Sequence, residues 1–148
     1  MINIPKVEKK RVIIVGCGFA GLTLARKLKN ADFQVVIIDK HNYHQFPPLF
    51  YQVASAGLEA SSILFPLRKI FQNYNDYHIR KAEVKAVDSV NNQLVTTAGI
   101  VGYDYLVLAH GATNSYFGSV QMQQHSRAMK TIAEVLDLRN NLLMNFEN

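Results

Sequence analysis

Three glycines and one carboxylate are the groups in this sequence best suited to hold a ligand. The apolar residues 12–15 run into Gly16, Gly18 and Gly21, which have the spacing G-x-G-x-x-G. Between a strand and a helix, the first glycine permits a tight turn, the second admits a pyrophosphate and the third allows close packing. The helix N-terminus then offers unpaired N–H groups and a positive dipole end to the anion. The pattern predicts a dinucleotide-binding site.

An acid at the end of the next apolar segment completes this pattern. Residues 33–38 have the composition of a buried parallel strand, and Asp39 follows them. The acid follows the glycines at close to the spacing of about 20 residues that is typical of a ribose ligand. A carboxylate there accepts hydrogen bonds from adenosine ribose and repels a 2′-phosphate, which argues against NADP. It does not separate NAD from FAD, because both carry an unmodified ribose.

Apolar periodicity places these groups in an α/β fold. A helix is expected to begin near Phe19, and a further buried strand is expected over residues 103–109, where it runs into Gly111. Residues 77–90 and 94–97 have strand patterns joined by an Asn-Asn turn, which predicts a hairpin or meander. Short helices are expected over residues 51–56 and 61–71, the second bent or ended by Pro66, and an amphipathic helix over residues 130–146.

Residues 40–50 are dense in aromatic residues, prolines and hydrogen-bonding side chains, which predicts a loop. Its planar side chains suit a pocket for a flat heterocycle, but aromatic residues also pin ordinary loops to a domain, and both interpretations stay open. His41 and His44 have no cysteine or carboxylate at ligand spacing around them. No metal site is therefore predicted.

Composition indicates one folded domain, with 49% hydrophobic and 18% charged residues in a chain of 148. The net charge of +5 is spread along the chain, and no nucleic-acid motif appears, so we expect no nucleic-acid partner. Residues 1–10 are expected to form a flexible basic leader ahead of a domain over residues 11–148. The longest apolar stretch, residues 46–67, contains three prolines and Glu59, which a membrane-spanning helix would not tolerate.

Cys17 is the only cysteine, so no internal disulfide can form and a reducing, cytoplasmic location is indicated. Its position inside the glycine turn favours a packing role over a reactive one, although a helix N-terminus lowers the pKa of a nearby thiol.

Three segments together resemble the two-dinucleotide-binding flavoprotein superfamily and, within it, the type II NADH dehydrogenases, which are non-pumping NADH:quinone oxidoreductases. The glycine turn (residues 15–22) and the strand and turn at residues 103–111 are general to the superfamily. Residues 39–44 with 48–54 select the type II enzymes. The resemblance implies a Rossmann-like FAD-binding domain, with a parallel sheet, helices on one face and a small antiparallel meander, incomplete relative to the full family fold.

The same resemblance implies FAD as the cofactor and no catalytic side chain, because the flavin carries the chemistry. The glycines would cradle the pyrophosphate, Asp39 would hold the ribose, the loop of residues 42–49 would approach the flavin, and residues 109–111 would close over it. The expected cofactor-binding residues are Gly16, Gly18, Phe19, Ala20, Gly21, Asp39, Lys40, Asn42, Phe46, Pro48, Leu49, Val84 (by its backbone, at the adenine), Ala109, His110 and Gly111.

Relatives in this family carry a second glycine-rich unit for NADH, a returning segment at the flavin, a quinone pocket and a C-terminal membrane-attachment region. We expect this chain to be the N-terminal FAD-binding part of a longer respiratory enzyme that passes electrons from NADH through FAD to a membrane quinone, and to be inactive alone. The resemblance implies a bacterial enzyme at the cytoplasmic face of the inner membrane, attached peripherally through the missing region. A homodimer is left open.

Two alternatives stay open: another pyridine-nucleotide-dependent flavoprotein reductase, or a non-catalytic FAD- or NAD-binding module. Disulfide reductases and sulfide oxidases of the superfamily need a pair of cysteines, and a chain with only Cys17 fits neither. The chain departs from the family pattern at Cys17, where relatives have glycine or alanine, and at His110, which replaces a small or hydroxyl residue.

Overall fold

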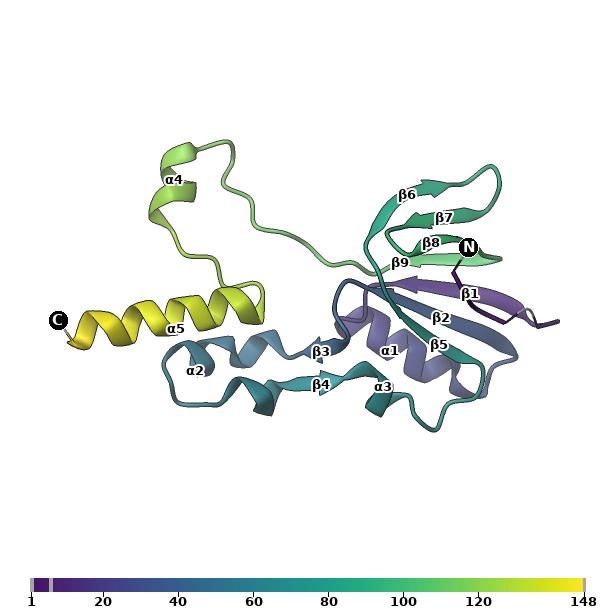
Figure 1. Ribbon diagram of the computed structural model, residues 1–148, viewed down its shortest axis with the longest axis horizontal. Helices are drawn as coiled ribbons and strands as arrows, with labels where there is room; N and C mark the ends of the chain where they lie inside the picture. Colours follow the sequence, from purple (N-terminus) through teal and green to yellow (C-terminus); the bar gives the residue numbers. More distant parts are fainter. Residues whose placement is uncertain (1, 6, 148) are drawn as a thin grey trace. The chain divides into compact units, whose positions relative to one another are not determined.

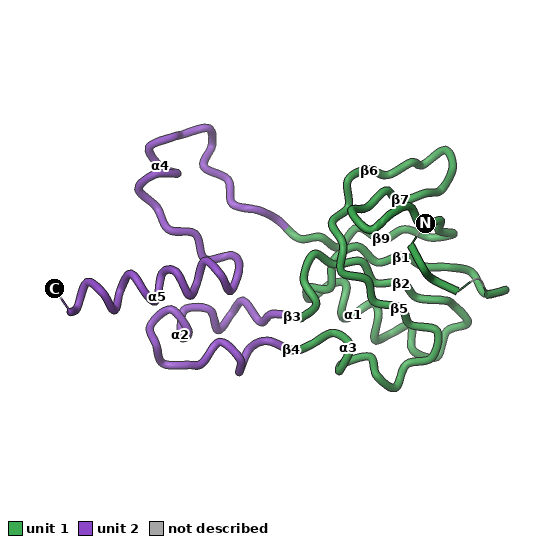
Figure 2. Tube along the Cα trace, viewed as in Figure 1, with its two compact units in different colours: residues 1–44, 66–111 green, residues 45–65, 112–148 purple. Residues whose placement is uncertain are grey.

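The computed structural model describes residues 2–5 and 7–147. It contains two compact units, each built from two separate chain segments (Figure 2). Unit 1 comprises residues 1–44 and 66–111, and unit 2 comprises residues 45–65 and 112–148. The chain leaves unit 1 within β3 (Tyr43–Gln45) and returns within β4 (Leu64–Pro66), and these two strands pair. Each unit therefore forms only when distant parts of the sequence meet.

A four-stranded sheet in the order β5-β2-β1-β9 forms the centre of unit 1 (Figure 1). Its strands are β1 (Lys10–Val15), β2 (Phe33–Asp39), β5 (Tyr77–Lys81) and β9 (Tyr105–Leu108), and every pairing is parallel. Parallel neighbours need a crossover connection, which α1 (Phe19–Lys27) and the short turn η1 (Leu28–Asn30) supply between β1 and β2. The predicted parallel α/β fold is confirmed.

Alternating side chains of the central strands enter two separate cores. On one face, Val12 and Ile14 of β1 pack with Ala25 of α1 and with Leu67 of α3 (Leu67–Ile70). On the other face, Ile13 packs with residues of an antiparallel meander. The meander consists of β6 (Val84–Asp88), β7 (Gln93–Thr96) and β8 (Gly99–Gly102). Helices thus cover one face and the predicted meander the other, which suits a parallel sheet with apolar residues on both sides.

Several local predictions were wrong. Residues 61–71 do not form one helix but η3 (Ala60–Ile63), β4 and α3, because Pro66 lacks an N–H and keeps its predecessor extended. The expected strand over residues 77–90 is two strands in different sheets, since the chain turns at Ala82, whose N–H donates to the Asp39 carbonyl at 2.9 Å. The expected loop over residues 40–50 contains β3 and η2 (Pro47–Leu49). Neither β8 nor α4 (Val120–His125) was predicted.

Described residues of the expected basic leader contact unit 1. Ile2 is buried in the meander-side core, and its N–H donates to the Ile100 carbonyl at 3.2 Å. The Pro5 carbonyl accepts hydrogen bonds from Arg11 and from the buried amide of Gln34. Sequence patterns did not reveal these contacts, because they depend on side chains distant in the sequence.

Unit 2 is a helical pair. Helix α2 (Phe50–Ala54) packs against α5 (Ile132–Glu147), which confirms the helix predicted over residues 130–146. Thr131 Oγ1 accepts the N–H of Glu134 at 3.3 Å, and the Glu134 carboxylate accepts the N–H of Thr131 at 2.8 Å, which is a capping box. None of the helices in the described residues has the length and apolar character needed to cross a bilayer.

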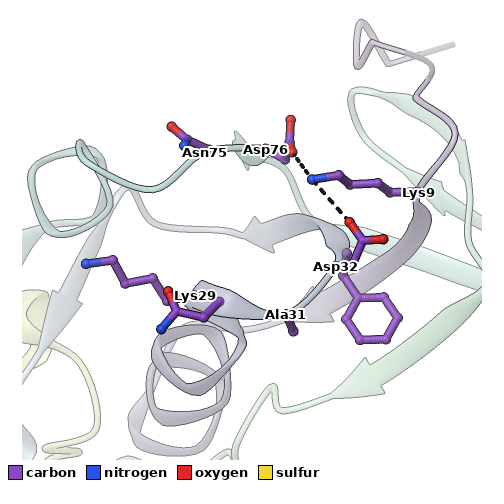
Figure 3. A pocket seen from close by; sticks show the side chains of 8 residues that line it. Lys9, Lys29, Ala31, Asp32, Asn75 and Asp76 are labelled. Atoms are coloured by element: carbon purple, nitrogen blue, oxygen red, sulfur yellow. Dashed lines mark hydrogen bonds and ion pairs between the residues drawn. The ribbon is translucent and has the colours of Figure 1, made fainter.

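A hollow of about 250 Å³ lies at the amino edge of the unit 1 sheet (Figure 3). Lys9 Nζ lies 3.3 Å from the carboxylate of Asp32 and 2.8 Å from that of Asp76. These acids precede β2 and β5, so the ammonium group ties together the starts of three strands. Cofactors of open α/β sheets bind at the carboxyl edge, so we do not assign this hollow at the amino edge to the cofactor site.

The contact between α1 and the glycine turn gives the first prediction. A Cβ on Gly21 would lie 1.9 Å from the Gly16 carbonyl oxygen, so Gly21→Ala must force the helix away from β1. We expect the free energy of unfolding, measured by urea denaturation, to fall by about 3 kcal/mol. Gly18→Ala is the matched control, because nothing lies within 4 Å of a Cβ there, and it should cost less than about 1 kcal/mol. Similar losses in the two variants would contradict this packing.

Candidate cofactor site

Asp39 and the glycine turn meet at the carboxyl edge of the sheet. Asp39 ends β2, and its Oδ2 accepts the backbone N–H of Cys17 at 2.6 Å. Its Oδ1 accepts the N–H of His41 at 2.7 Å. A carboxylate has about four lone-pair sites, so two backbone bonds leave acceptor capacity for a ligand hydroxyl. The acid thus lies where the glycine pattern requires it.

The turn is held between the ends of β2 and β9. Gly16 has a φ of +90°, and its N–H donates to the Ile38 carbonyl at 2.8 Å. A Cβ on Gly16 would lie 2.5 Å from the Ala109 carbonyl oxygen, so the two segments touch through their backbones. The Ala109 N–H donates to the Val15 carbonyl at 2.8 Å. The structure therefore brings Ala109 and His110 of the predicted segment to the turn.

The start of α1 presents an open surface beside the turn. Gly18, Phe19 and Ala20 are exposed, and nothing lies within 4 Å of a Cβ built on Gly18. The first N–H groups of any helix lack intrahelical partners, and here the N-cap residue, Gly18, has no side chain to bond them and no acid lies in the first turn. Basic residues occupy only the last turn, as Arg26 and Lys27. Space, amides and dipole direction all fit a diphosphate.

The segment after Asp39 folds back on the turn. His44 is buried, its Nδ1–H donates to the Cys17 carbonyl at 2.9 Å, and its ring meets Phe19 edge-on at 5.7 Å. His41 stacks on Tyr43 with ring centroids 5.1 Å apart, and burial lowers the pKa of His41 because it disfavours the imidazolium. Lys40 and Asn42 are exposed. The contact of His44 was not predicted, since nothing in its sequence spacing distinguishes it from His41.

Backbone beyond β5 reaches the tip of β2. The Ala82 N–H donates to the Asp39 carbonyl at 2.9 Å, and Val84 begins β6 two residues later. Val84 is half-buried against the meander-side core. Val84, the predicted adenine contact, therefore follows by two residues a backbone hydrogen bond to Asp39.

Cys17 is enclosed within the turn. Its side chain is 2% exposed, and burial, with a smaller contribution from the charge of Asp39, raises its pKa to about 12. The thiol therefore stays protonated at neutral pH and packs in the helix-side core. This agrees with the packing role that its small size suggested.

Twelve of the fifteen candidate residues belong to unit 1, and Phe46, Pro48 and Leu49 belong to unit 2. Those in unit 1 are Gly16, Gly18, Phe19, Ala20, Gly21, Asp39, Lys40, Asn42, Val84, Ala109, His110 and Gly111. His110 and Gly111 are exposed, and Gly111 has a φ of +75°. Across residues 2–5 and 7–147, no group of three or more histidine, cysteine and acidic side chains is arranged to hold a metal ion.

Comparisons with known proteins agree with this geometry. The chain is 37% identical to the type II NADH:quinone oxidoreductase NdhA of Mycobacterium tuberculosis, over 94% of the chain and 30% of that protein. It is 34% identical to the type II NADH:quinone oxidoreductase Ndh of the same organism, over 95% of the chain and 31% of that protein. These relatives confirm the resemblance found in the sequence, and the chain spans about 30% of their length.

A solved structure with the same fold is the sulfide:quinone oxidoreductase of the hyperthermophilic bacterium Aquifex aeolicus. The TM-score is 0.85 at 25% identity, over 94% of this chain and 33% of that chain. Residues 10–145 match the family described as pyridine nucleotide-disulphide oxidoreductase. With the glycine turn, the acid at the tip of β2 and the parallel sheet in place, the chain belongs to the pyridine nucleotide-disulphide oxidoreductase family.

Proposed function

We propose that this chain binds FAD and forms the FAD-binding portion of a flavin-dependent NADH:quinone oxidoreductase. The observation that carries the proposal is the Asp39 carboxylate beside an exposed helix start, with open space at Gly18, at the carboxyl edge of the sheet. The named activity of the Mycobacterium tuberculosis relatives supports the choice of reaction. An NADH-binding unit and a quinone site would belong to further parts of such an enzyme.

In this proposal each part of the site holds one part of the cofactor. The amides at Gly18 and the start of α1 hold the diphosphate, and Gly111 and Ala109 border it. Asp39 accepts hydrogen bonds from the adenosine ribose, while the backbone near Val84 meets the adenine. The segment containing Asn42, Phe46, Pro48 and Leu49 would border the flavin, and Lys40 and His110 would lie at the rim. FAD held by these residues would supply the redox chemistry that links NADH to a quinone.

The proposal extends to partners and location. NADH and a membrane quinone are the expected substrates of the whole enzyme. The expected site of action is the cytoplasmic face of a bacterial inner membrane, with peripheral attachment and a homodimer as further parts of the proposal.

Ligand selectivity tests the proposed function directly. The groups in unit 1 fit the adenosine diphosphate half of the cofactor, so FAD and ADP should compete for one site while FMN should not bind. Titration calorimetry of the purified chain with each ligand measures this. Binding of FMN but not ADP, or the absence of binding by both FAD and ADP at millimolar concentration, would overturn the proposal.

Replacing the acid gives a second prediction. Asp39→Ala should weaken FAD or ADP binding by about 100-fold, since the ribose hydroxyls lose two hydrogen bonds to a charged acceptor. It should also lower the free energy of unfolding by about 1–3 kcal/mol, because the N–H groups of Cys17 and His41 lose their acceptor. Calorimetric titration and urea denaturation separate the two effects.

Asp104→Ala is the matched control for this variant. Asp104 Oδ2 accepts the N–H of Arg11 at 2.7 Å near the amino end of β1, far along the strand from the glycine turn. This control should lose stability and keep the wild-type ligand affinity. If both variants lose affinity to the same extent, Asp39 acts only through the fold and is no ribose ligand.

The buried thiol gives a third prediction. Because burial raises the pKa of Cys17 to about 12, the folded chain should react with a disulfide reagent at pH 8 at least 100-fold more slowly than the urea-unfolded chain. In the unfolded state the pKa returns to its ordinary value near 9.0, so the thiol stabilises the fold fully below pH 9 and loses this contribution between pH 9 and 12. Rapid reaction of the native protein at pH 8 would show a reactive cysteine instead.

A further inference from the structure

The imidazole of His44 is built into the glycine turn. The residue is 6% exposed, and its Nδ1 lies 2.9 Å from the carbonyl oxygen of Cys17. A carbonyl oxygen only accepts hydrogen bonds, so Nδ1 carries the hydrogen. The ring also meets Phe19 edge-on at a centroid distance of 5.7 Å, which fixes its orientation.

This hydrogen bond sets the direction of one peptide group. The Cys17 carbonyl and the Gly18 N–H belong to the same planar trans peptide, in which C=O and N–H point in opposite directions. With the carbonyl held by His44, the Gly18 N–H points away from the imidazole. Asp39 holds the preceding peptide through the Cys17 N–H at 2.6 Å. Two side chains thus fix the peptides on both sides of Cys17.

The hydrogen bond from Gly16 to the Ile38 carbonyl restrains the start of the turn, whereas the Cys17 carbonyl is held by the imidazole. Glycine accepts many backbone conformations, and no side chain caps the helix at Gly18. An amide that already points in its binding direction saves the entropy cost of ordering it when the ligand arrives. We propose that His44 is a positioning residue of the diphosphate site, which aims the Gly18 N–H by holding the Cys17 carbonyl. This inference rests on the function proposed above.

Three substitutions separate a positioning role from simple filling of the core. The Asn side chain places an N–H at the same number of bonds from the backbone as Nδ1, so His44→Asn should keep the bond to the Cys17 carbonyl. His44→Gln moves the amide one bond further out and should lose it, and His44→Leu removes the donor. His78→Leu, at a half-buried histidine on β5, is the control for loss of an imidazole elsewhere in unit 1.

Nuclear magnetic resonance of the ligand-free chain tests the geometry independently of any cofactor. At pH 8, the ¹⁵N spectrum should show the Nδ1–H tautomer of His44. The Cys17 ¹³C′ and Gly18 ¹⁵N resonances should shift in His44→Leu and His44→Gln and stay near their wild-type positions in His44→Asn and His78→Leu. An Nδ1 without hydrogen, or resonances of residues 17 and 18 that ignore all His44 variants, would overturn the proposal.

Calorimetric titration with FAD and ADP tests the consequence. We expect the affinity for FAD and ADP to fall about tenfold in His44→Leu and His44→Gln, which corresponds to the loss of one hydrogen bond. In His44→Asn, which keeps that bond, the affinity should fall less than about threefold. Equal affinities across the four His44 proteins would refute positioning and leave the proposed function standing. Should the wild-type chain bind neither ligand, the proposed function and the role assigned to His44 in it both fall, whatever the resonances show. If His44→Leu does not fold, the comparison of His44→Gln with His44→Asn tests the positioning role.

Discussion

The carboxylate of Asp39 holds two backbone amides at once, that of Cys17 inside the glycine turn and that of His41 beyond β2. Both are charge-assisted bonds, the stronger class of hydrogen bond in proteins. Through them, one side chain joins the end of β2 to a turn that follows β1. The geometry of the candidate site depends on this interaction, because the glycines have no side chains with which to fix their own conformation.

The sheet places these groups at a common level. Val15 lies opposite Ile38 of β2 and Leu108 of β9, so three strands end side by side at one edge. Apolar side chains on both faces of the sheet, with helices on one side and the meander on the other, bury this register. A slip of one residue would exchange the two cores, so the pairing is strongly specified. The scaffold is therefore stiff where the backbone of the turn must be accurate.

Periodic and local features could be predicted from the sequence. The run from β1 through the glycines to β2 and Asp39 was predicted because β-branched runs, glycine spacing and a terminal acid each have a direct steric meaning. The features that the sequence did not reveal depend on long-range contacts: the N–H of Ala82 donates to the Asp39 carbonyl, and Ile2 packs in the meander-side core. The bond from His44 to Cys17 belongs to the same class, since only the folded chain brings residues 17 and 44 together.

The split construction of unit 2 has a consequence for synthesis on the ribosome. Helix α2 carries the buried residues Phe50, Val53 and Ala54, yet its partner α5 begins at Ile132. At translation rates of about 5–20 residues per second, α5 is synthesised on the order of ten seconds after these apolar side chains. Unit 1 becomes complete as soon as β9 emerges. The nascent chain thus exposes an apolar segment without its partner helix after the unit 1 sheet can close. During this interval the segment can be bound by chaperones.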